Sequence, residues 1–430
     1  MHREVLKLSI PNILSNISVP LISTVDTALM GHLSSAHLGA VGIGAMIFNF
    51  IYWNFGFLRM GVTGMTAQAY GRENREEQVH LLLRAVFIAL CIASFLLILM
   101  VPIEYISINA MNVDPTNASL VSEYFRIRII AAPASLLIYV IVGWFLGMQN
   151  AIFPLLITLF VNVVNAGISI YLVKYLNMSI AGVAWGTVLA QYIGLVFALL
   201  LYLSRYKSLL YDAKTNMILQ WESLRKFIKI NTDIFFRTIC LTLSFAFVYS
   251  QSSTQGELIL AVNVILLQLL NWMSYGIDGF AFSAESMVGK YKGAQDESRT
   301  YQSIRLAFIW GGVLAVIYSL VFGLGYVSII QLFTNDVAVI EKAQEFRIWM
   351  AIFPIIAFGC YIWDGVFIGL TAVKAMRNTM FFSFIIFILS YYVLRNIAPE
   401  KSIWLALMLF LFVRGVSQSY IFARKNLNIT

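Results

Sequence analysis

"AVFIALCIASFLLILMV", residues 85–101, is a run of seventeen residues without a charge, and runs of this kind decide the fold class. They recur along the 430-residue chain, of which 60% is hydrophobic and only 12% is charged. A soluble globular domain has roughly 45–50% apolar and about 25% charged residues, so the composition indicates a protein that lies in a lipid bilayer. Lipid offers the backbone no hydrogen-bond partners, and long continuous apolar runs therefore indicate spanning helices. A membrane barrel would show short alternating strands instead.

Twelve segments are apolar enough to span a membrane, for which about 20 residues are needed. They lie near residues 8–31, 38–70, 79–101, 124–148, 151–173, 180–204, 232–250, 256–289, 303–331, 346–370, 378–396 and 402–423. The least apolar connection, 205–231, divides the chain near its middle. We therefore predict an all-α integral membrane protein with an N-terminal six-helix lobe (1–204), a cytoplasmic linker (205–231) and a C-terminal six-helix lobe (232–430).

The distribution of Lys and Arg predicts the orientation in the membrane. With the N-terminus in the cytoplasm, 19 of the 29 basic residues fall in cytoplasmic stretches and 7 in outer stretches. The other three, Arg59, Arg237 and Arg414, lie within or at the edge of apolar segments. Basic loops stay in the cytoplasm during insertion, so both termini are predicted to be cytoplasmic. The same loops account for the net charge of +8, and we expect no nucleic-acid partner.

Three pairs of similar segments indicate an internal duplication. They are "YFRIRIIAAP" (124–133) with "EFRIWMAIFP" (345–354), "GWFLG" (143–147) with "GVFIG" (365–369), and, more weakly, "GVTGMTAQAYGR" (61–72) with "GFAFSAESMVGK" (279–290). The three pairs follow one another in the same order and at nearly one offset along the chain. A unit with six spanning helices inserts the same way up in both copies, so the halves should be related by a pseudo-two-fold axis along the membrane normal. Two such bundles with a cavity between them are typical of transporters.

Asp26 is an acid well inside the first apolar segment. Ile22, Ser23, Leu29 and Met30 occupy the neighbouring helical turns, and none of them is basic. Burial without a cation favours the neutral form of a carboxyl group, so Asp26 could take up a proton on one side of the membrane and release it on the other. Alternatively, it lies solvated near the outer interface. Pro11 and Pro20 can each kink this helix, and protonation of Asp26 could change its bend.

The fifth and sixth segments carry a group of neutral polar residues. Asn162 and Asn165 are three residues apart, and Asn165 and Ser169 are four apart, so Asn165 and Ser169 share a helix face. Thr187 on the sixth segment could join them. Such a face either joins helices together or lines a cavity, and the sequence leaves both interpretations open.

The second half carries its own charges within apolar segments. Asp233 and Arg237 are four residues apart, and we expect them to form a structural ion pair. In the weaker of the three alignments, Asp278 matches the residue next to Arg59, which leaves an ion pair between Arg59 and Asp278 open. Asp364 is deep in the tenth segment, and the sequence supports a functional role and a structural role equally.

The chain lacks the sequence motifs of enzymes. It has no phosphate loop of the GxxxxGK type, and its four His residues, at 2, 32, 37 and 80, have no metal-ligand spacing. Cys91, Cys240 and Cys360 are isolated in apolar runs and predict no disulfide framework. We expect neither catalysis nor a metal or other cofactor. A transporter without an ATPase motif must use an ion gradient or the gradient of its substrate.

Three stretches resemble the MATE (multidrug and toxic compound extrusion) transporters. They are "LKLSIPNILSNISVPLISTVDTALMGHL" (6–33), "NTDIFFRTICLTLSFAF" (231–247) and "YGIDGFAFSAESMVGKYKGA" (275–294), the last two being similar to the branch named after DNA-damage-inducible protein F. The resemblance covers almost the whole chain. It implies twelve helices in two lobes around a V-shaped cavity, in a monomer of the bacterial inner membrane. It also implies antiport of organic, often cationic or amphipathic compounds against protons or sodium ions.

The resemblance also implies roles for particular residues. The helix-1 proline and aspartate of the family fall on Pro11 and Asp26, its helix-5 asparagine on Asn165 and its helix-6 threonine on Thr187. Ser169 departs from the pattern, because many relatives have an acid there. One carboxylate instead of two favours proton coupling through Asp26, although sodium coupling remains open. We therefore expect a proton-coupled exporter of small organic compounds. A flippase for lipid-linked precursors is the alternative.

Overall fold

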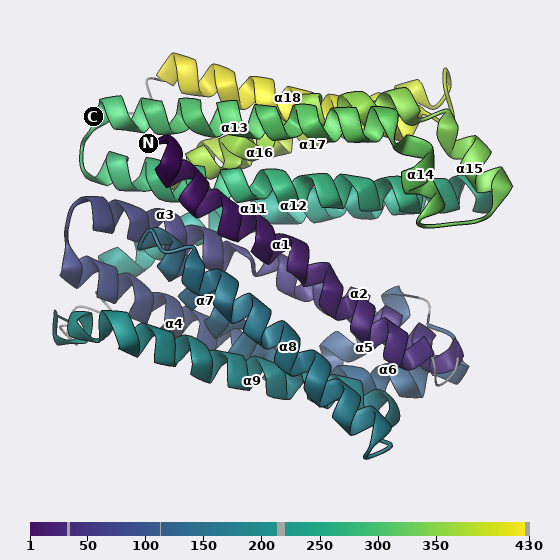
Figure 1. The fold of residues 1–430 in the computed structure, drawn as a ribbon, viewed down its shortest axis with the longest axis horizontal. Helices are drawn as coiled ribbons and strands as arrows, with labels where there is room; N and C mark the ends of the chain where they lie inside the picture. The colour runs from purple at the N-terminus through teal and green to yellow at the C-terminus, as the bar shows by residue number, and fades with distance from the viewer. Residues whose placement is uncertain (32–34, 112, 213–219, 426–430) are drawn as a thin grey trace. The chain divides into compact units, whose positions relative to one another are not determined.

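The computed structural model consists of helices, and every regular element of the described residues is helical (Figure 1). The backbone is described for residues 1–31, 35–111, 113–212 and 220–425, and the side chains of residues 20–28, 30–36, 116 and 425 also lie outside the described part. Within it, eleven helical segments are long and apolar enough to cross a membrane. α1 (His2–Gly31) corresponds to the remaining predicted segment. The predicted all-α, multi-pass architecture is confirmed.

The first half runs from α1 to a short 3₁₀ helix, η2. Its further elements are α2 (Ser35–Asn54), α3 (Phe57–Gly71), α4 (Arg75–Ile98), α5 (Met100–Ala110), α6 (Pro115–Arg128), η1 (Ile129–Ala131), α7 (Ala132–Gly147), α8 (Ile152–Lys174), α9 (Ser179–Tyr206) and η2 (Lys207–Asp212). The over-long second predicted segment is thus two helices, α2 and α3, which are separated by a turn at Phe55 and Gly56.

The second half begins with α11, which is longer than predicted. Its elements are α11 (Trp221–Ser253), α12 (Glu257–Gly293), α13 (Glu297–Leu324), α14 (Tyr326–Gln331), α15 (Val337–Gln344), α16 (Arg347–Gly369), α17 (Val373–Leu394) and α18 (Ser402–Lys425). α11 begins eleven residues before the predicted start at 232. Its first three turns are too polar to be recognised as a membrane span, but they bury Phe227 and Ile230 against the protein.

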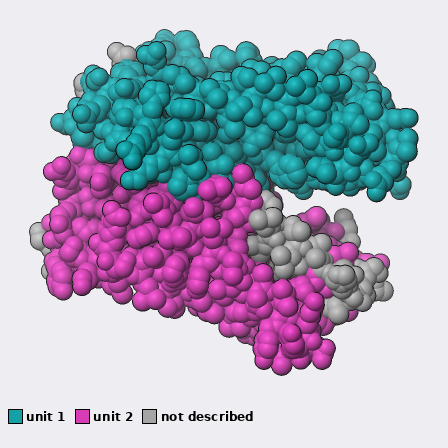
Figure 2. All heavy atoms as spheres, in the orientation of Figure 1, with its two compact units in different colours: residues 1–13, 229–430 teal, residues 14–228 magenta. Residues whose placement is uncertain are grey.

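The chain divides into two compact units, which Figure 2 shows in different colours. One unit comprises residues 14–228, and the other comprises residues 229–430 together with residues 1–13 of α1. In the latter unit, the Ser283 hydroxyl donates to the carbonyl of Val5 (3.3 Å) and the Tyr291 hydroxyl donates to the Glu4 carboxylate (3.3 Å). Gly279 of α12 allows close approach, because a Cβ there would overlap the side chain of Ile13. The first half of α1 is therefore integral to the C-terminal unit.

Each unit contains the same glycine-dependent helix contact. In the N-terminal unit, Gly143 of α7 lies against the carbonyl oxygen of Arg59 in α3, and any Cβ at Gly143 would overlap it. In the C-terminal unit, Gly365 of α16 lies against the carbonyl oxygen of Ala281 in α12 in the same way. Gly143 and Gly365 are separated by the same number of residues as Arg59 and Ala281. The duplication inferred from the sequence thus has a counterpart in helix packing.

Backbone geometry fixes the offset between the two copies. Left-handed residues recur at Glu73 (φ 55°) and Gln295 (φ 57°) and at Gln149 (φ 61°) and Thr371 (φ 54°), and side-chain helix caps recur at Asn74 and Asp296. All three pairs have the same offset as Gly143 and Gly365. The weaker sequence match was therefore aligned wrongly: residues 61–72 correspond to 283–294 and not to 279–290. The error is four residues, about one helical turn, and small residues repeat at that spacing in both segments.

Candidate functional site

Three of the predicted polar residues meet between α8 and α9; we name Asn165, Ser169 and Thr187 the α8–α9 cluster. The Nδ2 of Asn165 donates to the Thr187 hydroxyl (3.0 Å), which donates to the carbonyl of Val183 (3.1 Å). Asn165 is 1% exposed and Ser169 is fully buried. Among the described residues, the Oδ1 of Asn165 and the hydroxyl of Ser169 have no hydrogen-bond partner. A buried polar atom left in this state costs about 1–3 kcal/mol, so the cluster has unused capacity to bind.

A small residue on α9 brings the two helices together at this point. A Cβ at Gly186 would overlap the hydroxyl of Ser169 and would lie 2.9 Å from the Cα of Ser169. Glycine in the helix interior costs about 1 kcal/mol relative to alanine, but here it allows the two backbones to pack closely. The backbone of α9 is thereby in direct contact with Ser169.

Asn162 lies on another face of α8 and contacts α1. Its Nδ2 donates to the carbonyl of Ser18 (3.0 Å). One turn away, the Ser15 hydroxyl donates to the hydroxyl of Thr158 (2.9 Å). Asn162 therefore joins two helices and is not part of the α8–α9 cluster. The hydroxyl groups of α1 were not recognised in the sequence, although Ser15 and Ser18 are three residues apart on one face.

The α1 residues predicted to act in coupling are only partly described. α1 is continuous through Pro11 and Pro20. Asp26 lies in the same helix, eight residues after Ser18. The side chains of Pro20 and Asp26 lie outside the described part of the structure. The roles of these residues therefore remain predictions.

A second polar group is buried in the C-terminal unit; we name Arg237, Asp364, Arg414 and Gln418 the Asp364 cluster. One oxygen of Asp364, on α16, accepts from Arg237 of α11 and from Arg414 of α18. The other oxygen accepts from the Nε2 of Gln418 at 2.9 Å. The side chains of Arg237, Asp364 and Arg414 are 8%, 9% and 1% exposed. The cluster joins α11, α16 and α18 through charge-assisted hydrogen bonds.

The predicted pair of Asp233 with Arg237 is wrong. Asp233 instead pairs with Arg377 of α17, and Arg237 pairs with Asp364. Spacing of four residues allows a pair along one helix, but both side chains instead meet opposite charges on other helices, Asp233 on α17 and Arg237 on α16. Arg414 and Gln418, themselves four residues apart, could have been recognised as polar residues on one face of an otherwise apolar helix.

Arg59 and Asp278 lie in different units, Arg59 on α3 and Asp278 on α12. At the corrected offset Asp278 corresponds to Gly56 and no longer to the neighbour of Arg59, so the sequence argument for their ion pair is withdrawn. Asp278 lies within electrostatic range of both Arg237 and Arg414. It therefore contributes negative charge near the Asp364 cluster.

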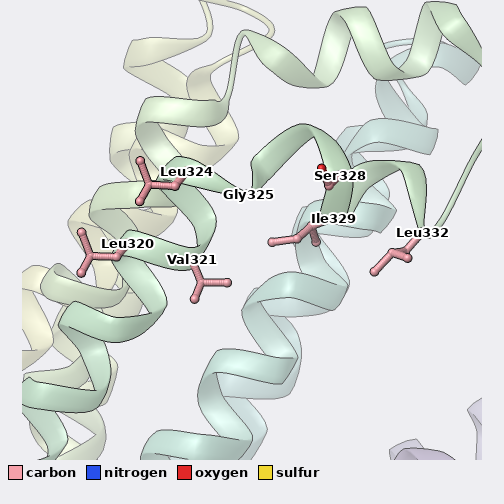
Figure 3. A pocket seen from close by; sticks show the side chains of 7 residues that line it. All are labelled: Leu320, Val321, Leu324, Gly325, Ser328, Ile329 and Leu332. Atoms are coloured by element: carbon pink, nitrogen blue, oxygen red, sulfur yellow. The ribbon is translucent and has the colours of Figure 1, made fainter.

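A pocket of about 470 Å³ lies at the junction of α13 and α14 (Figure 3). It is lined by Leu320, Val321, Leu324, Gly325, Ser328, Ile329 and Leu332. The lining is apolar apart from Ser328 and contains no titratable group. None of the residues predicted to act in transport lines this pocket.

Comparison with known proteins identifies the family. The MatE family model matches the chain twice, over residues 11–171 and 234–393. The chain belongs to the MatE family. The two matches end at residues 171 and 393, which are separated by the same offset as Gly143 and Gly365. They start at residues 11 and 234, which differ from that offset by one residue. The two matches therefore support the duplication of this MatE protein.

Two relatives and one solved structure illustrate the match. DNA damage-inducible protein F of Escherichia coli is 34% identical over 97% of this chain and 91% of the relative. Multidrug and toxin extrusion protein 1 of Danio rerio is 26% identical over 81% of this chain and 59% of the relative. A multidrug resistance MATE family transporter of the MOP superfamily, in the outward-facing conformation, superposes with a TM-score of 0.89 at 16% identity, over 99% of this chain and 96% of the other.

Membership of the MatE family confirms the class of protein. Members are membrane transporters and not enzymes, and the relatives support multidrug efflux of small organic compounds. Together with the membrane spans, they make this MatE protein a multi-pass transporter. The matched ranges contain Asp26, Asn165 and Asp364, whereas Thr187, Arg414 and Gln418 lie outside them.

Proposed function

We propose that this chain is a secondary antiporter that exports organic, cationic or amphipathic compounds in exchange for protons, with Asp26 as the coupling carboxylate. One observation carries the proposal: within the described part of the chain, an acceptor of the α8–α9 cluster, the Oδ1 of Asn165, and the hydroxyl of Ser169 have no partner. Both are buried in a helix pair that otherwise has an apolar interior. They are suited to receive a group that arrives and leaves during the transport cycle.

The register between α1 and α8 supports Asp26 as that group. On α1, Ser15 and Ser18 form hydrogen bonds with Thr158 and Asn162 of α8. These partners lie 143 and 144 positions further along the chain. Continuing this register brings residue 26 level with Ser169. A protonated carboxyl group can donate to the Oδ1 of Asn165, whereas an ionised carboxylate cannot. Proton uptake by Asp26 would then strengthen the attachment of α1 to α8, and proton release would weaken it.

Sodium coupling and lipid translocation are the two alternatives to proton-coupled export. Sodium could be held by Asp26, the Oδ1 of Asn165 and the hydroxyls of Ser169 and Thr187, which are all oxygen donors. A flippase for lipid-linked precursors would need basic residues that face the translocated headgroup. The transport assay below separates these alternatives from proton-coupled drug export.

We further propose that the protein acts as a monomer in the bacterial inner membrane, with both termini in the cytoplasm. The excess of Lys and Arg on one side supports this orientation. A cysteine tag at either terminus, in intact cells, should react with a membrane-impermeant thiol reagent only after the cells are opened. Labelling in intact cells would reverse the orientation.

Transport by purified protein in liposomes tests the coupling. An imposed proton gradient should drive export of the cationic dye ethidium, and a sodium gradient should not. Asp26→Asn should abolish proton-driven movement, because an amide does not exchange a proton with water. Asp212→Asn is the matched control: Asp212 is an acid of the same unit that pairs with Arg75 at the surface, at 2.8 Å. Retained coupling in Asp26→Asn would refute the role of Asp26, and dye movement under sodium alone would name the other ion.

A further inference from the structure

A group of polar side chains in the N-terminal unit lies outside every site described above. Arg128 ends α6, and its guanidinium carbon lies 5.3 Å from the ring centre of Phe48 and 5.4 Å from that of Tyr52, both on α2. Ser135 of α7 lies next to Tyr52. Tyr52 and Ser135 are 7% and 5% exposed. Three helices thus bring a guanidinium, a phenol and a hydroxyl together within this unit.

The three groups are close together and satisfy one another only in part. The Tyr52 phenol lies within hydrogen-bonding reach of the Ser135 hydroxyl and of the Arg128 guanidinium. Among the described residues, the buried Nη1 of Arg128 has no hydrogen-bond partner. A guanidinium N–H can only donate, so the group that completes the cluster must accept a hydrogen bond. The guanidinium charge favours an acceptor that is negatively charged.

Arg126, two residues earlier on α6, shows how this helix pairs an arginine for structural purposes. Its Nε donates to the Glu104 carboxylate at 2.9 Å, and its side chain is 58% exposed. Glu104 also accepts from Ser122, so this carboxylate is fully used. In the described part of the chain, Arg128 has ring contacts and no ion pair.

The duplication shows that the fold does not require an arginine at position 128. In the sequence pair "YFRIRIIAAP" and "EFRIWMAIFP", Arg128 corresponds to Trp349, and at the offset found from backbone geometry it corresponds to Met350. The second copy has no arginine at this position in either alignment. A cation within a membrane-spanning segment is costly and usually marks a function.

We propose that Arg128, Tyr52 and Ser135 form a subsite for the oxyanion of an amphipathic organic substrate, such as a carboxylate, a sulfonate or a phosphate ester. The apolar part of the substrate would lie against the rings of Phe48 and Tyr52, whose centroids are 5.8 Å apart. The proposal rests on the proposed export function and names one class of substrate for it. A soluble organic anion and an anionic lipid headgroup offer the same chemistry to this subsite.

Binding of fluorescein to the purified protein in detergent, followed by fluorescence anisotropy, tests the subsite without transport. Arg128→Gln should weaken binding about 10- to 100-fold, since charge-assisted hydrogen bonds are lost. Arg128→Lys, which keeps the charge but not the fork of donors, should lie between wild type and Arg128→Gln. Arg126→Gln is the matched control and should bind like wild type. Equal binding by wild type and Arg128→Gln would overturn the proposal and indicate that ordered water fills the site.

Proteoliposomes separate the subsite from general transport and identify the source of the anion. Arg128→Gln should slow fluorescein export at least about tenfold and leave ethidium export within about twofold, whereas Asp26→Asn should stop both. Equal loss of both dyes in Arg128→Gln would mean structural damage and would overturn the proposal. Movement of a fluorescent phosphatidic acid, dependent on Arg128 and without fluorescein export, would support the same subsite for a lipid headgroup.

Discussion

Asp364→Asn tests whether the Asp364 cluster stabilises the C-terminal unit. The substitution keeps the shape of the side chain and removes its charge. Arg237 and Arg414 would then remain buried without the carboxylate that accepts from both of them. Asn can still accept from Gln418 through its carbonyl oxygen, so the loss is confined to the two ion pairs.

The burial of the cluster sets the magnitude. Because Arg414 is 1% exposed and Asp364 is 9% exposed, water can do little to replace the lost partner. Removing one partner of a buried ion pair typically costs about 3–5 kcal/mol. For a unit of this size, 1 kcal/mol lowers the melting temperature by roughly 2–4 °C. We therefore expect the melting temperature of this unit to fall by about 6–20 °C.

A thiol-reactive fluorogenic dye can follow the unfolding of this unit in detergent. Cys240 and Cys360 are 4% and 0% exposed and both lie in the C-terminal unit, so they react when it unfolds. Cys91 is exposed and is replaced by Ser to remove the background. The matched control is Asp296→Asn, at the N-cap of α13, where Asn caps about as well as Asp.

The melting temperatures of the variants, compared with one another, test this reasoning. Adding Arg414→Met to Asp364→Asn should restore part of the lost stability, because it removes one uncompensated cation. A melting temperature of Asp364→Asn within about 2 °C of wild type, equivalent to less than roughly 1 kcal/mol, would refute the reasoning. An equal fall in Asp296→Asn would show that the assay responds to any change of charge.

Two further predictions concern the C-terminal unit. In the same assay, Gly365→Ala should destabilise by about 1–3 kcal/mol, because the added methyl overlaps a backbone carbonyl. Gly359→Ala on the same helix, which meets nothing within 4 Å, should be neutral or stabilise by up to about 1 kcal/mol; equal effects would show that the close approach is not required. Outside the membrane, the hydrogen bond from Lys342 lowers the pKa of Glu345. Its stabilisation is therefore present above the ordinary Glu pKa of about 4.3 and is lost as the pH falls through the lower, folded-state pKa. With unfolding followed by tryptophan fluorescence, because thiols do not react at low pH, Lys342→Met should cost at most about 1 kcal/mol at pH 7, since the pair is exposed, and less at pH 3; a constant difference would contradict it.

Hydropathy predicted the spans well because the bilayer imposes one rule on every helix. It could not locate helix ends that lie against protein or water. α11 begins at Trp221, in a polar stretch in which only a few residues, such as Phe227 and Ile230, are buried. The turn at Gly56 likewise divides an apolar stretch that reads as one segment.

The sequence indicated which residues belong to the candidate sites, but it did not indicate all of their contact partners. The contact of Asn165 with Thr187 could be expected from the family resemblance, which placed both on facing helices. The arginine partners of Asp364 could not, because they come from other helices, at separations of 50 and 127 along the chain. Arg128 was counted as an outer basic residue, and its contact with the ring of Tyr52 depends on the packing of α2 on α6, which no local pattern encodes.

The membership of residues 1–13 in the C-terminal unit has a consequence for dissecting the molecule. A chain cut in the central connection would yield a second fragment without the helix that covers Gly279. That fragment would expose the surface of α12 around Gly279 that Ile13 covers, and we expect it to aggregate when produced alone. Supplying a peptide of residues 1–13, or fusing that peptide ahead of residue 229, should be needed to obtain a soluble, detergent-stable half.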